Sequence, residues 1–252
     1  ATPAVANVDG QGFAEVIFGN RIFTFAHDAG GALVLVDRFD APAGPSGTNS
    51  HGPITCVADL NADARQDIVS GTLAFTLPRP PTGATTRADC AANPPTNPEQ
   101  QAFCDGQLQT LWDASVVNAT PPGGDLGPIA AANLDGFCAV ADVLGTDPAA
   151  DPGPQNPLDG SPEIILISDG SLLILEGATG KLRRYTDLGG GRFGGTPNVD
   201  DFDGDGFPEI ATALENFYTV IDLQTPSTDC PAWPNLLLDN NVTARSIPEL
   251  AS

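Results

Sequence analysis

An acidic loop near the end of the chain has the residue types and the spacing of a metal site. Residues 201–209 read Asp-Phe-Asp-Gly-Asp-Gly-Phe-Pro-Glu, with acids at loop positions 1, 3, 5 and 9. A tight turn can bring three such side chains to one point, and glycine at position 6 permits the sharp bend. Six or seven hard oxygens favour Ca²⁺ over Mg²⁺, which prefers a smaller, rigid octahedron with retained water. The predicted ligands are Asp201, Asp203, Asp205, the Phe207 carbonyl and Glu209.

Two other interpretations fit parts of this loop. An EF-hand would place its bidentate Glu at position 12 and flank the loop with helices, whereas here the acid is at position 9 and the flanks are strand-like. Asp, Asn and Gly are also common in ordinary solvated turns. The position of the acid and the strand-like flanks argue against an EF-hand. Repetition of the loop along the chain favours a metal site over an ordinary turn.

The elements that must position this loop occur four times. In each copy an apolar strand leads into an Asp/Asn-rich loop, followed by a second strand, a tight turn and a third strand. The loops span residues 7–15, 59–67, 133–163 and 201–209, and the third contains an insertion. Asp169-Gly170 between two apolar runs is a strong hairpin signal. Without its excursions the unit is about 45 residues long, the length of a four-stranded propeller blade.

The sequence therefore predicts an all-β fold and, more specifically, a β-propeller. Four complete blades are expected at about residues 1–45, 52–110, 127–187 and 195–240, with insertions at 78–107 and 137–158. Residues 246–252 resemble Thr2–Asn7 and predict the first strand of a fifth repeat. We expect the chain to be part of a larger propeller of about seven blades. A closed ring of four blades is the alternative.

The repeats resemble the FG-GAP/VCBS repeats of integrin α-type β-propellers, whose blades carry a calcium loop between their first two strands. The resemblance covers nearly all of the chain outside the insertions, although Ala64 stands where the family usually has glycine. It implies up to four Ca²⁺ ions, the weakest at Asn7–Glu15, which has two carboxylates. By position, the implied ligands of the other loops are Asn7, Asp9, Gln11, the Phe13 carbonyl and Glu15; Asp59, Asn61, Asp63, the Arg65 carbonyl and Asp67; and Asn133, Asp135, Asp159, the Ser161 carbonyl and Glu163.

The charge balance argues against several classes of function. Lys and Arg number 10 against 32 Asp and Glu, a net charge of −22, so nucleic acids and anionic membrane surfaces would be repelled. No apolar run approaches the ~18 residues that a membrane-spanning helix needs. The 28 Gly and 24 Pro, with few good helix formers, favour β-structure. The chain begins at Ala1 and contains no Met, so we expect a processed or excised piece of a longer product.

Five cysteines favour an oxidising compartment, and we expect the protein to be extracellular or at the cell surface. Cys90 and Cys104 flank a Pro/Asn-rich excursion and are predicted to form a disulfide. The pairing of Cys56, Cys138 and Cys230 is left open, and the odd number leaves one thiol over.

No catalytic constellation stands out, and neither His27 nor His51 lies in a triad or metal-binding spacing. We therefore expect a calcium-stabilised scaffold for adhesion or assembly that binds a protein partner or like subunits through its inserted loops. A propeller enzyme (a polysaccharide lyase or a quinoprotein) and a carbohydrate-binding lectin are the alternatives. A quinoprotein needs regularly placed blade tryptophans and a lectin needs an aromatic residue repeated at one blade position, and neither pattern is present. Glycosylation triplets at Asn118 and Asn241 are compatible with secretion.

Overall fold

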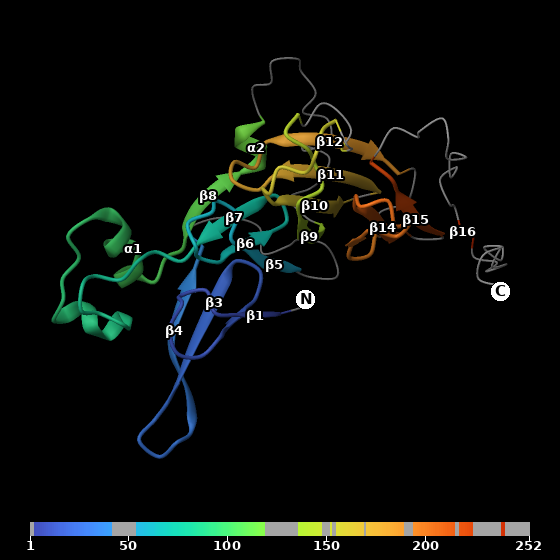
Figure 1. Cartoon of the computed structure of the whole chain (residues 1–252). Coiled ribbons are helices and arrows are strands. Elements are labelled where there is room, and N and C mark those ends of the chain that lie inside the picture. Colours follow the sequence, from blue (N-terminus) through green and yellow to red (C-terminus); the bar gives the residue numbers. More distant parts are fainter. Residues whose placement is uncertain are drawn as a thin grey trace.

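The computed structural model is built from strands and their connecting loops (Figure 1). It describes residues 3–41, 54–118, 136–147, 152, 155–168, 170–188, 194–214, 217–223 and 238–239. The strands in these residues form four antiparallel sheets, each of four strands that follow one another in chain order. The all-β class predicted from the sequence is therefore confirmed.

Each sheet takes its strands from one stretch of chain. The first contains β1 (Ala4–Ala6), β2 (Glu15–Ile17), β3 (Arg21–His27) and β4 (Leu33–Asp40). The second contains β5 (Thr55–Ala58), β6 (Asp67–Ser70), β7 (Leu73–Thr76) and β8 (Gln109–Asp113). The third contains β9 (Phe137–Ala141), β10 (Glu163–Ser168), β11 (Ser171–Glu176) and β12 (Leu182–Asp187). The fourth contains β13 (Asn198–Asp200), β14 (Glu209–Leu214), β15 (Phe217–Ile221) and β16 (Leu238–Asp239).

The sheets pack face to face in chain order. Since successive residues of a strand point to opposite faces, one strand can contribute side chains to the interfaces on both sides of its sheet. In the second sheet Ile68 packs towards the first sheet, whereas Val69 packs towards the third. The third sheet likewise turns Ile164 towards the second sheet and Ile165 towards the fourth. The two middle sheets are thus covered on both faces, which explains why every residue of β10 is buried.

The first strands of the sheets lie beside one another. β5 contacts both β1 and β9, and β9 contacts β13. Figure 1 shows β1, β5 and β9 near the middle of the molecule, with β4, β8 and β12 farther out. A disulfide between Cys56 and Cys138 joins β5 to β9, a pairing that the sequence leaves open. The remaining cysteine, Cys230, lies outside the described residues.

The insertion predicted at 137–158 begins too early. Phe137–Ala141 forms β9, which pairs with β10 and buries Cys138 between the second and third sheets. This apolar run gains a strand's ladder of hydrogen bonds and a place in the core, so it is not part of a protruding loop. The loop that leads to β10 consequently begins at Asp142.

The excursion between β7 and β8 is held by the predicted disulfide, Cys90–Cys104, which is confirmed. The bond joins a 3₁₀-helix, η1 (Arg87–Ala91), to α1 (Pro98–Asp105). Asn97 caps the start of α1 through its side chain, and Gly106 ends the helix with φ 71°. A short α2 (Ala114–Val117) follows β8. Among the described residues no helix has the length and apolar character needed to cross a bilayer.

The base of this excursion packs against the first sheet. Phe103 contacts Phe39 of β4 and is buried in the core between the first and second sheets. The backbone of Asp40 exchanges hydrogen bonds with Gly106 and Leu108, both at 2.9 Å. The base of the excursion is therefore part of the folded core, while α1 lies at the outer edge (Figure 1).

Removing the Cys56–Cys138 disulfide should destabilise the protein more than removing Cys90–Cys104. The bonded residues are 82 and 14 positions apart in sequence. For loops of these lengths the chain-entropy relation gives about 4.5 and about 3 kcal/mol. The variants Cys56→Ala/Cys138→Ala and Cys90→Ala/Cys104→Ala should lose about these free energies of unfolding, measured by urea denaturation. A smaller loss in the first variant would contradict this ranking.

Candidate metal centre

A buried carboxylate closes each of the four loops between a first and a second strand. The carboxylate belongs to the first residue of the second strand and accepts a hydrogen bond from the backbone N–H at loop position 2. This bond ties the end of each loop to its beginning. The four bonds run from Val8 to Glu15 (2.8 Å), from Leu60 to Asp67 (3.2 Å), from Val143 to Glu163 (2.9 Å) and from Phe202 to Glu209 (2.6 Å).

Four carboxylates converge in the fourth loop. One oxygen from each lies within 4.8 Å of the others, and the described part of the chain holds no other such cluster of acids. The backbone wraps around Asp201, whose Oδ1 accepts from the N–H of Gly204 (2.7 Å) and whose Oδ2 accepts from Gly206 (3.0 Å). The converging acids are those predicted from the sequence: Asp201, Asp203, Asp205 and Glu209.

One oxygen of this cluster has no protein partner. Glu209 is 3% exposed, and its Oε1 is buried without a hydrogen bond among the described residues. Burial, together with the nearby charges of Asp203, Asp205 and Asp222, raises the pKa of Glu209 to about 7. A buried acceptor without a partner is unfavourable by about 1–3 kcal/mol. The arrangement therefore fits a hard cation, which would bond to this oxygen and balance the charge.

The second loop repeats the hydrogen bonds of the fourth. Asp59 takes the place of Asp201: its Oδ1 accepts from Asp63 N–H (3.1 Å) and its Oδ2 from Ala64 N–H (2.9 Å). The closing Asp67 is fully buried, and its Oδ1 also lacks a hydrogen-bond partner in the described residues. Burial raises the pKa of Asp67, as it does for Glu209. The second loop thus repeats the backbone hydrogen bonds of the fourth, although its acids do not converge as closely as those of the fourth loop.

The second loop keeps this geometry without glycine. Ala62 and Ala64 have φ 58° and 66°, where the fourth loop has Gly204 and Gly206 at 82° and 92°. An L-residue in this left-handed region is disfavoured by about 1–2 kcal/mol. Strain of this kind persists where surrounding bonds over-determine the conformation, and here the bonds to the loop carboxylates do so.

In the third loop Asp142 stands at position 1, where the sequence analysis expects Asn133. Its Oδ2 accepts from Gly160 N–H (2.8 Å), and its Oδ1 is buried with no hydrogen-bond partner in the described residues. Asp159 and Glu163, both predicted ligands, lie close enough to Asp142 for their charges to interact. Burial, together with the nearby charges of Asp142 and Asp159, raises the pKa of Glu163 to about 7.

The predicted ligands Asn133 and Asp135 do not belong to the stretch 142–162 that joins β9 to β10. Both lie outside the described residues and precede β9 in the chain, whereas the loop follows β9. The sequence contained a signal for the missed residue, because Val140-Ala141-Asp142 repeats Val57-Ala58-Asp59 at the start of the second loop.

The first loop brings the fewest charges together. Asp9 Oδ1 accepts from Gln11 N–H (2.7 Å), and Glu15 is buried at the loop's end. Burial raises the pKa of both acids. The ring of Phe13 lies 5.0 Å from that of His27, which gives this histidine a packing role. Weak Ca²⁺ binding at this loop stays a prediction.

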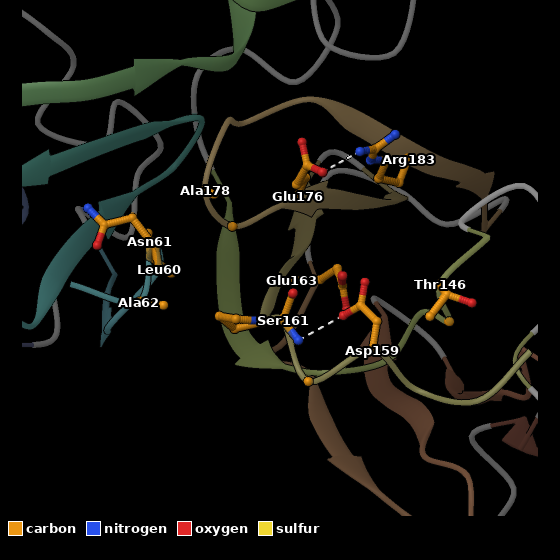
Figure 2. A pocket seen from close by; sticks show the side chains of 14 residues that line it. Leu60, Asn61, Ala62, Thr146, Asp159, Ser161, Glu163, Glu176, Ala178 and Arg183 are labelled. Atoms are coloured by element: carbon orange, nitrogen blue, oxygen red, sulfur yellow. Dashed lines mark hydrogen bonds and ion pairs between the residues drawn. The ribbon is translucent and has the colours of Figure 1, made fainter. Parts of the chain in front are cut away.

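A pocket of about 310 Å³ lies between the second and third loops (Figure 2). Asn61 lines one side, and Ser161 and Glu163 line the other. An ion pair between Glu176 and Arg183 forms its wall on the side of β11 and β12. The pocket shares Glu163 with the third loop, so a cation bound there would change the charge of its wall.

Comparisons with known proteins identify no family for this chain. No protein-family model and no curated protein matches it. Among solved structures, a lectin from Agrocybe aegerita, described as specifically recognising non-reducing terminal N-acetylglucosamine, aligns over 95% of this chain with a TM-score of 0.44 and 16% identity. The chain spans about half of that lectin, 52% of its length.

The raised pKa values predict that the metal-free protein loses stability as the pH rises. Glu163 and Glu209 have pKa values of about 7 in the folded protein, against 4.5 for an ordinary glutamate. Between these values the folded state binds more protons than the unfolded state, so the free energy of unfolding falls with rising pH. In excess chelator the thermal midpoint should fall over this range, and less steeply in Glu209→Gln than in the control Glu99→Gln. A midpoint that rises between these pH values would contradict the assignment.

Proposed function

We propose that the chain forms blades of a calcium-stabilised β-propeller of the FG-GAP/VCBS type. Three features support this architecture: four-stranded sheets that follow one another in chain order, first strands that lie side by side, and a carboxylate-closed loop between the first two strands of every sheet. Each sheet would be one blade, with its first strand nearest the axis.

The exposure of one loop residue supports a propeller with more than four blades. Val8, Leu60 and Val143, at position 2 of the first three loops, are 1%, 2% and 0% exposed because each packs against the next sheet. Phe202, at the same position of the fourth loop, is 50% exposed. In the proposed propeller a further blade covers Phe202, as the second, third and fourth sheets cover its counterparts.

The observation that carries the calcium proposal is the unpartnered carboxylate oxygen in the second and fourth loops. Asp67 and Glu209 are both buried, and in each one oxygen closes the loop while the other has no hydrogen bond among the described residues. Ca²⁺ binds six to eight oxygens at 2.3–2.6 Å in flexible geometry, which suits carboxylates of irregular loops better than the octahedron of Mg²⁺ does. Bound Ca²⁺ would link the first and second strands and reduce repulsion among the acids. The third site would use Asp142, Asp159, the Ser161 carbonyl and Glu163.

We further propose that the protein is a secreted or cell-surface scaffold that binds a protein partner or like subunits. The two disulfides among the described residues are typical of proteins from oxidising compartments. The outer part of the 78–107 excursion, which includes α1, is one surface that such a partner could contact.

Calcium should raise the thermal midpoint of the protein, and Mg²⁺ should do so much less. At a free concentration one hundred times the dissociation constant, one site adds about 2.7 kcal/mol, or roughly 5–10 °C for a chain of this size. Asp205→Asn should lower the affinity of the fourth site at least tenfold, whereas Asp105→Asn in α1 should leave the calcium response unchanged. An unchanged midpoint, together with no calcium in the untreated protein by metal analysis, would contradict the proposal.

The corrected third site can be tested by stoichiometry. Asp142→Asn should lose one bound Ca²⁺ in equilibrium dialysis, because it removes the position-1 carboxylate. Asp135→Asn should bind as many ions as the wild type, because the residue precedes β9. The reverse result would restore the ligand set first expected from the sequence.

A further inference from the structure

The outer half of the β3–β4 hairpin is apolar on both faces and exposed. Leu33, Val34, Leu35 and Val36 are 60%, 38%, 54% and 37% exposed, although they alternate between the two faces of the strand. Figure 1 shows the hairpin extending away from the other three sheets. An exposed apolar strand at the edge of a sheet is a template for pairing with another strand.

The outer strand of the third sheet differs from β4 in its charge. The outer strand of the third sheet, β12, reads Leu-Arg-Arg-Tyr-Thr-Asp, with three charged residues that discourage edge pairing. In the hairpin, by contrast, residues 29–36 carry no charge. The apolar edge is therefore a particular feature of the first sheet.

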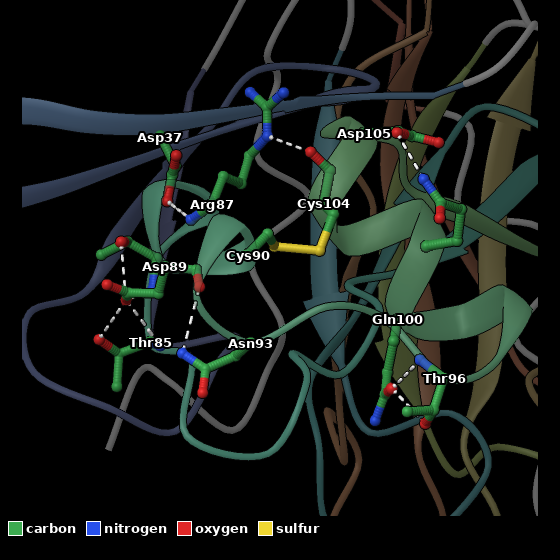
Figure 3. The surroundings of a disulfide bond; sticks show 12 residues. Asp37, Thr85, Arg87, Asp89, Cys90, Asn93, Thr96, Gln100, Cys104 and Asp105 are labelled. Atoms are coloured by element: carbon green, nitrogen blue, oxygen red, sulfur yellow. Dashed lines mark hydrogen bonds between the residues drawn. A yellow bond between two sulfur atoms is a disulfide. The ribbon is translucent and has the colours of Figure 1, made fainter.

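The excursion covers the inner half of this edge, and Figure 3 shows its Arg87 bonded to Asp37 of β4. Arg87 donates from its backbone N–H to Asp37 Oδ2 (2.9 Å) and from its guanidinium to the Arg38 and Cys104 carbonyls (both 3.3 Å). Asp40 pairs with the segment around Gln107. Along residues 33–36, no strand of the described chain lies on the outer side of β4.

We propose that β4 pairs with β4 of a second copy of this chain, in antiparallel orientation, to form a homodimer with a continuous eight-stranded sheet. Two copies that each carry a charge of −22 repel one another over most of their surfaces. The uncharged stretch 29–36 is where they can approach closely. A strand paired with its own copy about a two-fold axis is self-complementary, so one apolar edge supplies both halves of the interface.

The positions of the charged residues select one register. A two-fold axis through Val34 places Leu33 opposite Leu35 of the second copy and Val34 opposite its own equivalent. Directly opposite residues of an antiparallel pair share a face, so this register joins apolar side chains on both faces. It also leaves Asp37 and its bond to the excursion outside the paired segment.

The first test is the mass of the protein in solution, measured by light scattering during gel filtration. The wild type should have about twice the 25.8 kDa of one chain. The variant Leu33→Lys/Leu35→Lys should have the single-chain mass, because the register sets two lysines against two lysines. Tyr185→Lys, a change at another exposed position of an outer strand, should stay dimeric. A monomeric wild type, or a dimeric double-lysine variant, would overturn the proposal.

A crosslinking test does not depend on how the lysine variant folds. In a Cys230→Ser background, which leaves only the disulfide-bonded cysteines, Val34→Cys should form an intermolecular disulfide on mild oxidation. Tyr185→Cys in the same background should not. Absence of the Val34→Cys crosslink would show that another surface forms any dimer. The dimer needs no metal, so at a temperature where the chelated protein stays folded it should persist in chelator. Loss of the dimer from the folded, chelated protein would refute this interface while leaving the calcium proposal standing.

Discussion

The buried carboxylate at the start of each second strand is the interaction on which both the fold and the candidate metal centre depend. It accepts the N–H of loop position 2, and in the first three loops the side chain at that position is buried against the next sheet. The backbone that the carboxylate holds is therefore the backbone that joins neighbouring sheets. Packing of the sheets and closure of the loops stabilise one another, which is why a loop with strained alanines keeps the same shape as one with glycines.

The protein has acids in excess, and the salt bridges among its described residues lie outside the four loops. The salt bridges found among the described residues join Arg21 and Arg38 to Asp40, Arg79 to Glu99, and Arg183 to Glu176. None of these acids belongs to the four loops. Desolvation of the closing carboxylates then raises their pKa values, and neighbouring aspartates add to the effect. A cation from solution is the counter-charge that such an arrangement lacks.

The contacts between sheets and the outer edges of the sheets are stabilised in different ways. Cys56–Cys138 joins two first strands, while Cys90–Cys104 holds the excursion whose base covers part of β4. β12 protects its outer edge with charged side chains. The outer half of β4 has neither a covering segment among the described residues nor charged side chains. This difference from β12 is the reason for proposing it as a contact surface.

The all-β class, the four acids that converge in the fourth loop and the Cys90–Cys104 pair could be read from the sequence. Each depends on local spacing: alternation within a strand, acids at positions 1, 3, 5 and 9, and two cysteines across a short excursion. The place of Asp142 in the third loop and the pairing of Cys56 with Cys138 could be found only in the tertiary structure, because both follow from the position of β9. β9 is separated from its partner β10 by more than twenty residues of loop, and its register is set by pairing and burial, which no local pattern records. The unpartnered oxygens of Asp67 and Glu209 likewise exist only after the sheets have packed, since an acid in sequence is solvated and only burial removes its water.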